Sequence, residues 1–322
     1  MRAIVQDRYG TAEVLRLDEV DPPEPGPGEV RVRVRAAALD AGVWYLTTGR
    51  PPVAQLAFGL RRPKNRVAGQ ELAGTVDAVG AGVRRFAVGD EVFGTGRGAF
   101  AEVAVARENR LAHRPPQVAP EVAAALGVSG TTALQAVRDI GEVGAGQRVL
   151  VTGAGGGVGT FVVALSVARG ARVTAVAGPD KADLVARLGA ERHVDYTREP
   201  ITAAGTHDVV VDVAGNRPLR ELRRVLDPRG TLVLLGAGVT TSGFLGGAER
   251  QVRAALWSPF LRQRMRGFIG IAQADDLATL AGMCVDGRLT PAVEAVRPLA
   301  EAPDAVRELG AGHARGKTVL VP

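Results

Sequence analysis

The stretch Arg148-Val-Leu-Val-Thr-Gly-Ala-Gly-Gly-Gly-Val-Gly-Thr160 decides the fold of this chain. A short apolar run enters a glycine cluster, and a second apolar run, Phe161-Val-Val-Ala-Leu165, follows it. This order predicts a strand, a tight turn and a helix. Glycines let the turn close and let backbone N–H groups approach a phosphate, and the helix N-terminus adds partial positive charge. The stretch therefore predicts a cradle for a dinucleotide.

Length and composition predict an ordinary globular protein of two domains. The chain has 322 residues, with 46% hydrophobic and 23% charged side chains, and a domain takes roughly 150 residues. No apolar run reaches the ~18 residues of a membrane span, and the first ten residues lack a secretory apolar region. The single Cys284 excludes an intramolecular disulfide framework and a four-cysteine zinc site. We expect a cytoplasmic protein.

The net charge of +6 does not indicate a nucleic-acid partner. Only Lys64, Lys181 and Lys317 are lysines, so nearly all the positive charge is arginine, as codon bias in a GC-rich genome would produce. Acidic residues are interspersed throughout and no basic tail is present. Because the charges are weakly segregated, we expect no nucleic-acid binding.

Residues 1–110 predict a β-rich domain. Valines at 30, 32 and 34 alternate with arginines at 31, 33 and 35, which is typical of a half-buried strand. Residues 72–80 and 90–94 predict further short strands, and glycines punctuate them at turn spacing. This pattern favours a partly open barrel.

From about residue 115 the pattern changes to alternating strands and helices. Helical periodicity runs over 119–137, broken at 127–130, and further helices are predicted at 181–188 and 218–226. Apolar strands are predicted at 172–177, 193–196, 209–213 and 231–235. Strands with few polar positions are typical of a parallel sheet covered on both faces. Repeated strand–helix units predict a doubly wound α/β fold.

Residues 243–266 place apolar side chains at near-helical spacing with arginines between them. Such a helix can lie on a membrane surface. We favour a helix that caps the active-site cleft or an oligomer surface, with solvated arginines, and do not expect membrane association. Residues 267–271 predict an edge strand that could pair with a second subunit as a homodimer. Residues 317–321 predict a final strand that returns to the first domain.

Three segments in order carry a resemblance to a known family: Val79-Gly-Ala-Gly-Val-Arg-Arg-Phe-Ala-Val-Gly-Asp-Glu-Val92, Gly153-Ala-Gly-Gly-Gly-Val-Gly159 and Gly312-His-Ala-Arg-Gly-Lys-Thr-Val-Leu320. The chain resembles the zinc-independent medium-chain dehydrogenase/reductases of the quinone oxidoreductase (zeta-crystallin-like) group over its whole length. The resemblance implies a doubly wound, parallel-sheet Rossmann domain at 116–289. It also implies a GroES-like, partly open β-barrel catalytic domain at 1–115 plus 290–322.

No zinc site is expected. Zinc-dependent members of the wider family carry Gly-His-Glu where this chain has Gly69-Gln-Glu71, and the cysteine expected near Asp40 is missing. The four histidines are scattered without ligand spacing, whereas catalytic zinc needs three protein ligands. Without a Lewis acid, hydride delivery to a quinone or a conjugated enone is the more natural chemistry.

The second strand of the doubly wound region ends at Val176-Ala-Gly-Pro-Asp-Lys181 and favours NADPH over NADH. An NAD enzyme usually places an acid here to hold the ribose 2′-hydroxyl. Gly178 leaves space for a 2′-phosphate and Lys181 supplies a charge for it. The resemblance implies that Lys181 and Tyr196 contact that phosphate. Asp180 argues against this, unless it caps the following helix.

The resemblance also implies the remaining cofactor contacts. Thr132 should lie near the nicotinamide or its ribose, and Arg315 and Lys317 near the cofactor cleft, unless these two are solvated charges before a final strand. The other implied contacts belong to the cradle and to the loops after the fourth and fifth strands: Gly153, Gly156, Gly157, Val158, Gly159, Gly215, Asn216, Gly236, Ala237 and Gly238.

The catalytic segment departs from the family. Relatives resemble Asn-Pro-Gly-Asp-Trp-His beside the nicotinamide, where this chain has Asp40-Ala-Gly-Val-Trp-Tyr45. Burial would raise the pKa of Asp40 and let it donate a proton, and Tyr45 could bond a substrate carbonyl or protonate an enolate. Either residue could instead serve packing or a turn. The departure indicates a specialised substrate.

Three functions are therefore weighed. The first is an NADPH-dependent reductase of quinones or α,β-unsaturated carbonyl compounds. The second is a zinc-free, NADP-dependent carbonyl reductase or alcohol dehydrogenase. The third is a catalytically silent NADPH-binding protein that captures a partner through residues 243–266.

Overall fold

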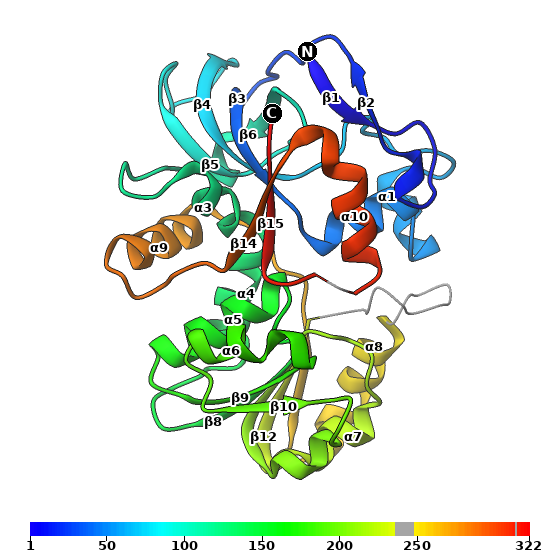
Figure 1. Cartoon of the computed structure of the whole chain (residues 1–322), viewed down its shortest axis with the longest axis vertical. Coiled ribbons are helices and arrows are strands. Elements are labelled where there is room, and N and C mark those ends of the chain that lie inside the picture. Colours follow the sequence, from blue (N-terminus) through cyan, green and yellow to red (C-terminus); the bar gives the residue numbers. More distant parts are fainter. Residues whose placement is uncertain (236–247, 313) are drawn as a thin grey trace. The chain divides into compact units, whose positions relative to one another are not determined.

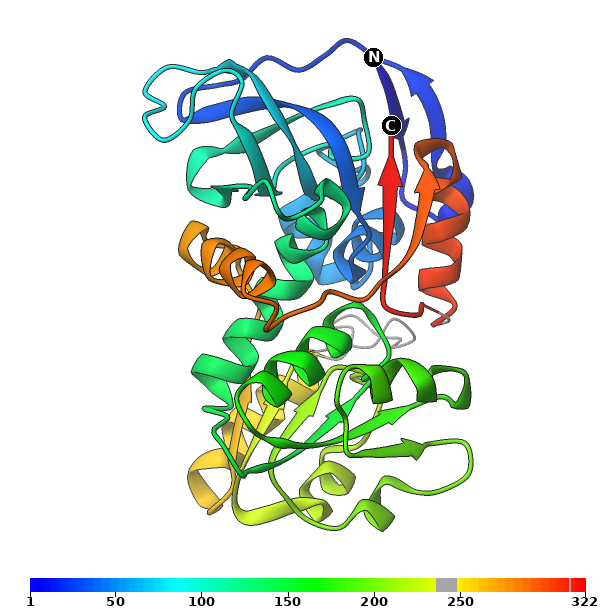
Figure 2. The ribbon, with the colours of Figure 1, turned by 60° about the vertical axis from the view of Figure 1, so that its left-hand side comes forward.

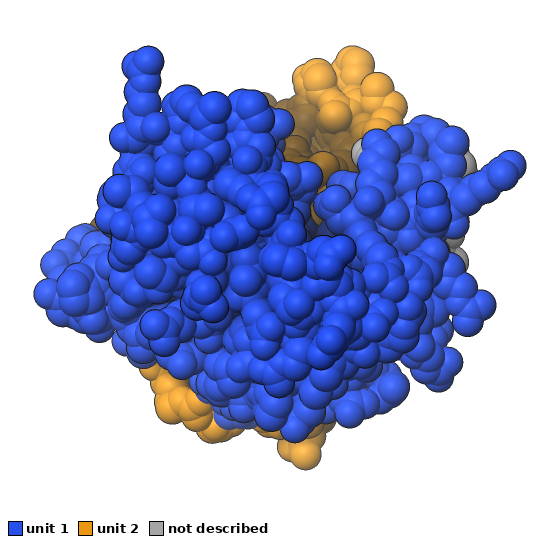
Figure 3. All heavy atoms as spheres, turned by 90° about the horizontal axis from the view of Figure 1, so that it is seen from above, with its two compact units in different colours: residues 1–131, 271–322 blue, residues 132–270 orange. Residues whose placement is uncertain are grey.

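The computed structural model describes residues 1–235, 248–312 and 314–322, and it divides into two compact units (Figure 1). Unit 1 comprises Met1–Thr131 with Ile271–Pro322, and unit 2 comprises Thr132–Gly270 (Figure 3). Unit 2 is shorter at both ends than the dinucleotide domain expected at 116–289. The difference arises because α3 (Pro120–Ala124) packs on strands of unit 1, and α9 (Ala274–Val285) packs on another strand of unit 1.

Unit 1 is built on a seven-stranded sheet whose order is β14-β15-β3-β4-β5-β7, with β6 also paired to β3. The strands are β3 (Glu29–Ala38), β4 (Glu71–Val79), β5 (Glu91–Thr95), β6 (Val103–Arg107), β7 (Leu111–His113), β14 (Val293–Pro298) and β15 (Lys317–Val321), and β1 (Arg2–Val5) pairs separately with β2 (Arg16–Glu19). Besides α3 and α9, its α-helices are α1 (Ala41–Thr48), α2 (Gln55–Phe58) and α10 (Ala302–Gly310). Short helical turns are η1 (Ala12–Val14), η2 (Pro52–Ala54), η3 (Glu108–Arg110), η4 (Leu126–Gly130) and η9 (Leu299–Glu301).

The alternation that predicted the first long strand is confirmed in β3. Val30, Val32 and Val34 are buried in the core of unit 1, and Arg33 and Arg35 are exposed. The predicted return of the C-terminal strand is also confirmed, because β15 pairs antiparallel with β3 and parallel with β14 (Figure 2). The C-terminal strands are therefore joined to strands from the first third of the chain within one sheet.

Unit 2 is a six-stranded parallel sheet with the order β10-β9-β8-β11-β12-β13. Its strands are β8 (Arg148–Thr152), β9 (Arg172–Ala177), β10 (Arg192–Asp195), β11 (His207–Asp212), β12 (Leu226–Leu234) and β13 (Arg264–Gly267). Its helices are α5 (Gly157–Ala168), α6 (Ala182–Arg187), α7 (Leu219–Arg224) and α8 (Ala248–Trp257), with α4 (Thr131–Gln135) spanning the boundary. Shorter turns are η5 (Ala136–Ile140), η6 (Pro179–Lys181), η7 (Ile201–Ala204) and η8 (Ser258–Phe260). The strand order reverses between β8 and β11, which is the switch point where doubly wound sheets bind ligands.

Several boundaries differ from the expectation. The predicted edge strand at 267–271 is wrong in position, because β13 ends at Gly267 and Ile269 is 84% exposed. The alternation that forms the strand is Arg264-Met-Arg266, with only Met265 buried. The helix predicted to reach residue 226 ends two residues earlier, since Leu226 already begins β12.

The predicted break at 127–130 is also wrong. The chain stays helical there as the π-helical turn η4, and a second π-helical turn, η5, follows α4. A Cβ on Gly127 would lie 2.8 Å from the Gly94 carbonyl oxygen of β5, so glycine here permits close packing rather than a turn. Widened π-turns of this kind frequently occur at functional sites.

Gly69, just before β4, is fixed by both its backbone and its surroundings. Its φ is +90° and an added Cβ would lie 2.4 Å from the Cδ1 atom of Phe100, which is fully buried. Gly82 has a φ of +78°, but an added Cβ would have no atom of the described residues within 4 Å beyond its chain neighbours. Gly69 therefore carries both constraints, and Gly82 carries one.

We expect Gly69→Ala to lower the free energy of unfolding by about 2–4 kcal/mol, because left-handed backbone strain and core overpacking add. Gly82→Ala is the matched control and should cost only about 1–2 kcal/mol from strain. Urea unfolding followed by circular dichroism measures both. Equal losses in the two variants would contradict the packing argument.

Candidate functional site

The glycine turn after β8 forms as predicted. Gly153 has a φ of +65°, Gly156 lies at the N-cap of α5 in extended conformation, and the helix begins at Gly157. A Cβ on Gly159 would lie 2.0 Å from the Gly153 carbonyl oxygen, so this glycine is required for the helix to approach the turn. Within the described parts of the chain, a Cβ on Gly156 would meet only that same oxygen, at 3.5 Å. Packing therefore requires Gly159 but not Gly156.

The loop after β11 lies at the same edge of the sheet. Asp212 at the end of β11 is in register with Thr152 at the end of β8. Gly215 is buried with a φ of +69°, and Asn216 beside it is exposed. The structure thus brings Gly153–Gly159 and Gly215–Asn216 together at the carboxyl ends of adjacent parallel strands, where ligands bind in such sheets.

Lys181 and Tyr196 are brought to the other side of the glycine turn. The Lys181 side chain packs over Gly155, where an added Cβ would lie 2.5 Å from its Cδ atom. The Tyr196 hydroxyl lies 3.6 Å from the Cβ position of Gly178, and the Tyr196 side chain is 54% exposed. The Asp180 carboxylate lies 2.7 Å from that same Cβ position. The phenol and the acid considered from the sequence therefore lie beside Gly178, and the cation lies beside Gly155 of the glycine turn.

Two further cofactor predictions, for Thr132 and for the loop after β12, stay predictions. Thr132 packs against Gly270, whose Cβ position lies 2.3 Å from the Thr132 hydroxyl oxygen. The predicted contacts Gly236, Ala237 and Gly238 lie outside the described residues.

Asp40 caps α1. Its Oδ1 atom accepts a 2.6 Å hydrogen bond from the Gly42 backbone N–H. Its Oδ2 atom is buried and has no hydrogen-bond partner in the described parts of the chain. Burial raises the pKa of Asp40, and the nearby Lys317 ammonium opposes that rise. A protonated Oδ2 would relieve the burial of an unpartnered charge.

Tyr45 lies in α1, one turn beyond this cap. Its ring packs edge-on against Trp44, with 5.4 Å between the ring centroids. The side chain is half-buried, and burial raises the pKa of its hydroxyl, so the phenol is neutral at physiological pH. A neutral phenol can donate a proton or a hydrogen bond.

Lys317 was expected near the cofactor cleft, but the structure gives its ammonium internal partners. Its ammonium is fully buried in unit 1, where it pairs with the Glu71 carboxylate and donates to the Leu39 carbonyl (2.5 Å) and the Ser129 hydroxyl (2.9 Å). The expected contact with a cofactor is therefore replaced by an internal ion pair. Arg315 likewise pairs with Glu294 at 2.7 Å.

Glu71 is the functional-region residue that the sequence reasoning missed. Its Oε1 atom accepts from the Val128 and Ser129 backbone N–H groups of η4, at 2.5 and 3.0 Å. Burial raises the pKa of Glu71 to about 7, while Lys317 lowers it. The signal was an acid opening an apolar strand, Glu71-Leu-Ala-Gly74, together with a scarce lysine near the C-terminus.

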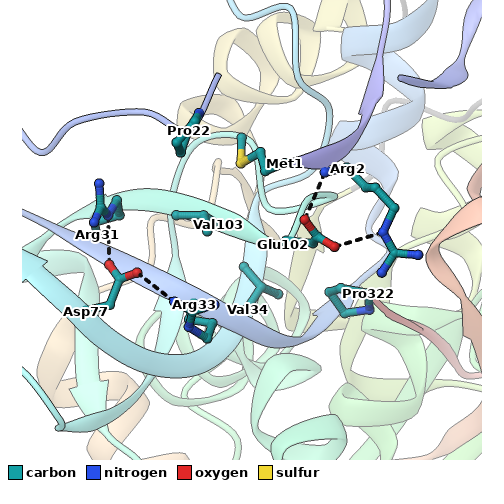
Figure 4. Close-up of a pocket in the computed structure, with 10 residues that line it drawn as sticks. All are labelled: Met1, Arg2, Pro22, Arg31, Arg33, Val34, Asp77, Glu102, Val103 and Pro322. Carbon is teal, nitrogen blue, oxygen red and sulfur yellow. Dashed lines mark hydrogen bonds and ion pairs between the residues drawn. The ribbon is translucent and has the colours of Figure 1, made fainter. Parts of the chain in front are cut away.

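Unit 1 also holds a cavity of about 470 Å³, whose lining residues Figure 4 draws. Its two acidic side chains are both paired: Asp77 with Arg31 at 2.8 Å and with Arg33 at 3.7 Å, and Glu102 with Arg2 at 2.8 Å. None of the predicted site residues lines this cavity.

Among the described residues, no group of three or more His, Cys, Asp or Glu side chains is placed to hold a metal ion. The same part of the chain contains no helix long and apolar enough to cross a membrane.

Two family models match the chain. Residues 26–116 match the alcohol dehydrogenase GroES-like domain, and residues 188–320 match the model described as zinc-binding dehydrogenase. A quinone oxidoreductase from Pseudomonas aeruginosa is 34% identical over 98% of this chain and 97% of its own length. A chloroplastic quinone-oxidoreductase homologue from Spinacia oleracea is 30% identical over 100% of this chain and 98% of its own.

Solved structures match the whole chain. A quinone oxidoreductase from Coxiella burnetii has a TM-score of 0.86 at 25% identity, covering 100% of this chain and 99% of its own. A mycobacterial protein in complex with NADPH has a TM-score of 0.83 at 26% identity, and an NAD-dependent alcohol dehydrogenase 0.81 at 31%; both cover 100% of each chain. The fold is therefore a GroES-like domain with a Rossmann-like parallel sheet, as the sequence predicted.

We expect Lys317→Met to lower the free energy of unfolding by about 3–5 kcal/mol, because it leaves Glu71 buried without its ion-pair partner. Adding Glu71→Gln should recover part of this loss, since the unpaired charge is then removed. Lys64→Met, at an exposed lysine, is the control and should cost less than about 0.5 kcal/mol. Urea unfolding of the four proteins measures these differences. A double variant less stable than Lys317→Met would contradict the charge-pair account.

Proposed function

Because this chain belongs to the quinone oxidoreductase group of the medium-chain dehydrogenase/reductases, and is thus an oxidoreductase, we propose that it reduces a quinone or an α,β-unsaturated carbonyl compound with NADPH. The observation that carries the cofactor assignment is the grouping of Lys181 and Tyr196 around Gly155 and Gly178. A lysine ammonium is a suitable partner for a 2′-phosphate. The mycobacterial neighbour holds NADPH, which supports the same assignment.

The residues of the sheet edge fit a dinucleotide. Gly156 has an extended backbone that any residue could adopt, and among the described residues no atom beyond its chain neighbours comes closer than 3.5 Å to its Cβ position. A glycine that packing does not require is explained if a ligand approaches its backbone closely. We assign Gly153, Gly156, Gly157, Val158 and Gly159 to the pyrophosphate, beside the N-terminus of α5.

The other cofactor contacts remain part of the proposal. Gly215 and Asn216 follow β11 and would face the nicotinamide half, together with Thr132. The contacts predicted for Gly236, Ala237 and Gly238 are kept as sequence-based proposals. Lys317 is assigned a structural role, because its ammonium is occupied by Glu71, Leu39 and Ser129.

The chemistry proposed for the protein is protonation of the reduced acceptor. NADPH, when bound, supplies a hydride to the β-carbon of an enone or to a quinone. Asp40 and Tyr45 are the proposed proton donors, directly or through water. Asp40 offers a raised pKa and a buried oxygen that has no hydrogen-bond partner among the described residues, and Tyr45 offers a neutral phenol.

We propose that the reaction needs no zinc. Gln70 occupies the place of the histidine in Gly-His-Glu, and an amide is a poor zinc ligand.

The second candidate function is a zinc-free, NADP-dependent carbonyl reductase or alcohol dehydrogenase, which the match to an NAD-dependent alcohol dehydrogenase favours. Oxidation of alcohols with no reduction of enones would select it.

We further propose a cytoplasmic homodimer. β13 is the last strand of its sheet, so its outer edge can pair with the same edge of a second subunit. Cys284 is a free thiol, which fits a reducing compartment. Sedimentation of the purified protein measures the oligomeric state.

Stopped-flow oxidation of NADPH against a panel of quinones and enones tests the proposed reaction.

Lys181→Met should weaken NADPH binding about tenfold and leave NADH binding within twofold, because only NADPH carries the 2′-phosphate. Arg187→Met in α6, an exposed cation paired with Asp183 on the same helix, is the control. Equal weakening of both cofactors would contradict the assignment of Lys181.

Asp40→Asn separates proton donation from helix capping, because asparagine is as good an N-cap as aspartate. If Asp40 is the donor, the rate falls as pH rises through its raised pKa, since the acid is then ionised. We expect Asp40→Asn to lower the rate about 10²-fold and to remove that limb of the pH profile. Tyr45→Phe is measured alongside, and loss of activity in it alone would assign the proton to the phenol.

A further inference from the structure

A second buried polar cluster lies in unit 2, at the carboxyl ends of β8 and β11. The Thr152 hydroxyl donates to the Asp212 Oδ1 atom at 2.6 Å, and the Ala214 backbone N–H donates to the Thr152 hydroxyl oxygen at 3.3 Å. Asp212 is fully buried and ends the apolar run Val209-Val-Val211. A carboxylate buried in such surroundings requires a charged partner.

Arg250, in the first turn of α8, is that partner. Its Nη2 atom donates to the Asp212 Oδ2 atom at 2.6 Å, and its Nη1 atom donates to the Gly215 carbonyl at 2.5 Å. The Arg250 side chain is only 14% exposed. Its planar fork therefore holds the end of β11 and the loop beyond it at the same time.

The cluster touches both segments that the proposed function places around the cofactor. Thr152 immediately precedes Gly153 of the glycine turn, and Gly215 immediately precedes Asn216. Lys181 and Tyr196 follow β9 and β10, on one side of the switch point. β11 lies on the other side. Because each side of a doubly wound sheet takes one half of a dinucleotide, the cluster belongs to the half opposite Lys181.

Stability alone does not explain the cluster. A buried ion pair contributes little to folding compared with apolar residues of similar volume, because removing both charges from water is costly. What the pair does provide is fixed geometry for the turn at Thr152–Gly153 and for the carbonyl of Gly215. Preorganised backbone groups bind a ligand more tightly because less conformational freedom is lost.

We propose that Arg250 is a positioning residue for the nicotinamide half of the cofactor, acting through Asp212, Thr152 and Gly215. The proposal rests on the NADPH site of the proposed function. Arg250 touches no reacting atom in this account. It makes α8 part of the cofactor site, so that the segment predicted from the sequence to cap a cleft has a defined physical link to the sheet edge.

Calorimetric binding of NADPH and of 2′,5′-ADP to the purified full chain tests the proposal. The second ligand carries the adenine-side phosphate but no nicotinamide. We expect Arg250→Met to weaken NADPH binding about tenfold or more and to leave 2′,5′-ADP binding within twofold. Arg250→Lys keeps the charge but cannot reach both acceptors, so it should restore NADPH binding in part.

Three controls make the result specific. Arg253→Met removes a cation that lies over the Trp257 ring on the same helix, 4.9 Å from its centroid, and should bind both ligands as the unaltered chain does. Thr152→Ser keeps the hydroxyl and should also behave normally, whereas Thr152→Val should weaken NADPH as Arg250→Met does. Thermal unfolding shows whether each variant is folded. If Arg250→Met does not fold, the comparison of Thr152→Ser with Thr152→Val tests the proposal instead.

The outcomes separate this proposal from the proposed function. Failure of the unaltered chain to bind either ligand would overturn the proposed function and this inference with it. Normal NADPH binding by the folded Arg250→Met and Thr152→Val variants would overturn only the role of Arg250. Equal weakening of both ligands would do the same, because it would show a general loss of structure rather than positioning of the nicotinamide half.

Discussion

The buried pair of Lys317 and Glu71 is the interaction on which the architecture of unit 1 depends. Lys317 begins β15 near the C-terminus, and Glu71 begins β4. Their remaining partners are Leu39, after β3, and the π-helical turn η4. Two charges without water need every one of these contacts, because each unpaired ion would cost several kcal/mol. The C-terminal segment must therefore return to the sheet for the first 131 residues to fold as they do.

The same physical device recurs in unit 2 with a different consequence. Asp212 and Arg250 are also an internal ion pair, and like Lys317 the arginine donates to a backbone carbonyl, but this pair lies at the carboxyl-terminal edge of a parallel sheet. In unit 1 the buried charges join strands, whereas in unit 2 they fix a loop and a helix beside the glycine turn. Among the described residues, each unit thus contains a buried ion pair close to a segment to which the proposed function assigns a role. Asp40 links these two roles in unit 1. Burial raises its pKa and the structural Lys317 ammonium opposes that rise, so the ion pair also acts on a proposed proton donor.

Features with a strong local signal could be predicted from the sequence. The alternation around Val32, the glycine turn from Gly153 and the strand from Lys317 all gave the correct elements, because local residue patterns determine them. The positions of Lys317 and Glu71 could not be predicted, since they are far apart in the chain and are brought together only by packing. The π-helical turn at Gly127 was mistaken for a break because glycine signals both a turn and a close contact. Arg250 was interpreted as solvated because its partner Asp212, like the partner of Lys317, is distant in the sequence and is brought close only by the fold.

Gly159 and Gly156, at the start of α5, are glycines for different physical reasons. Gly159 has no room for a side chain, so the turn and helix of this chain need glycine there whether or not a ligand binds. Gly156 has room, and a larger residue there would even reduce the entropy lost on folding. A protein that kept the scaffold but abandoned nucleotides would be free to replace the second glycine while retaining the first. Glycine at 156 therefore leaves room for the pyrophosphate assigned to this turn under the proposed function, whereas glycine at 159 is needed by the scaffold itself.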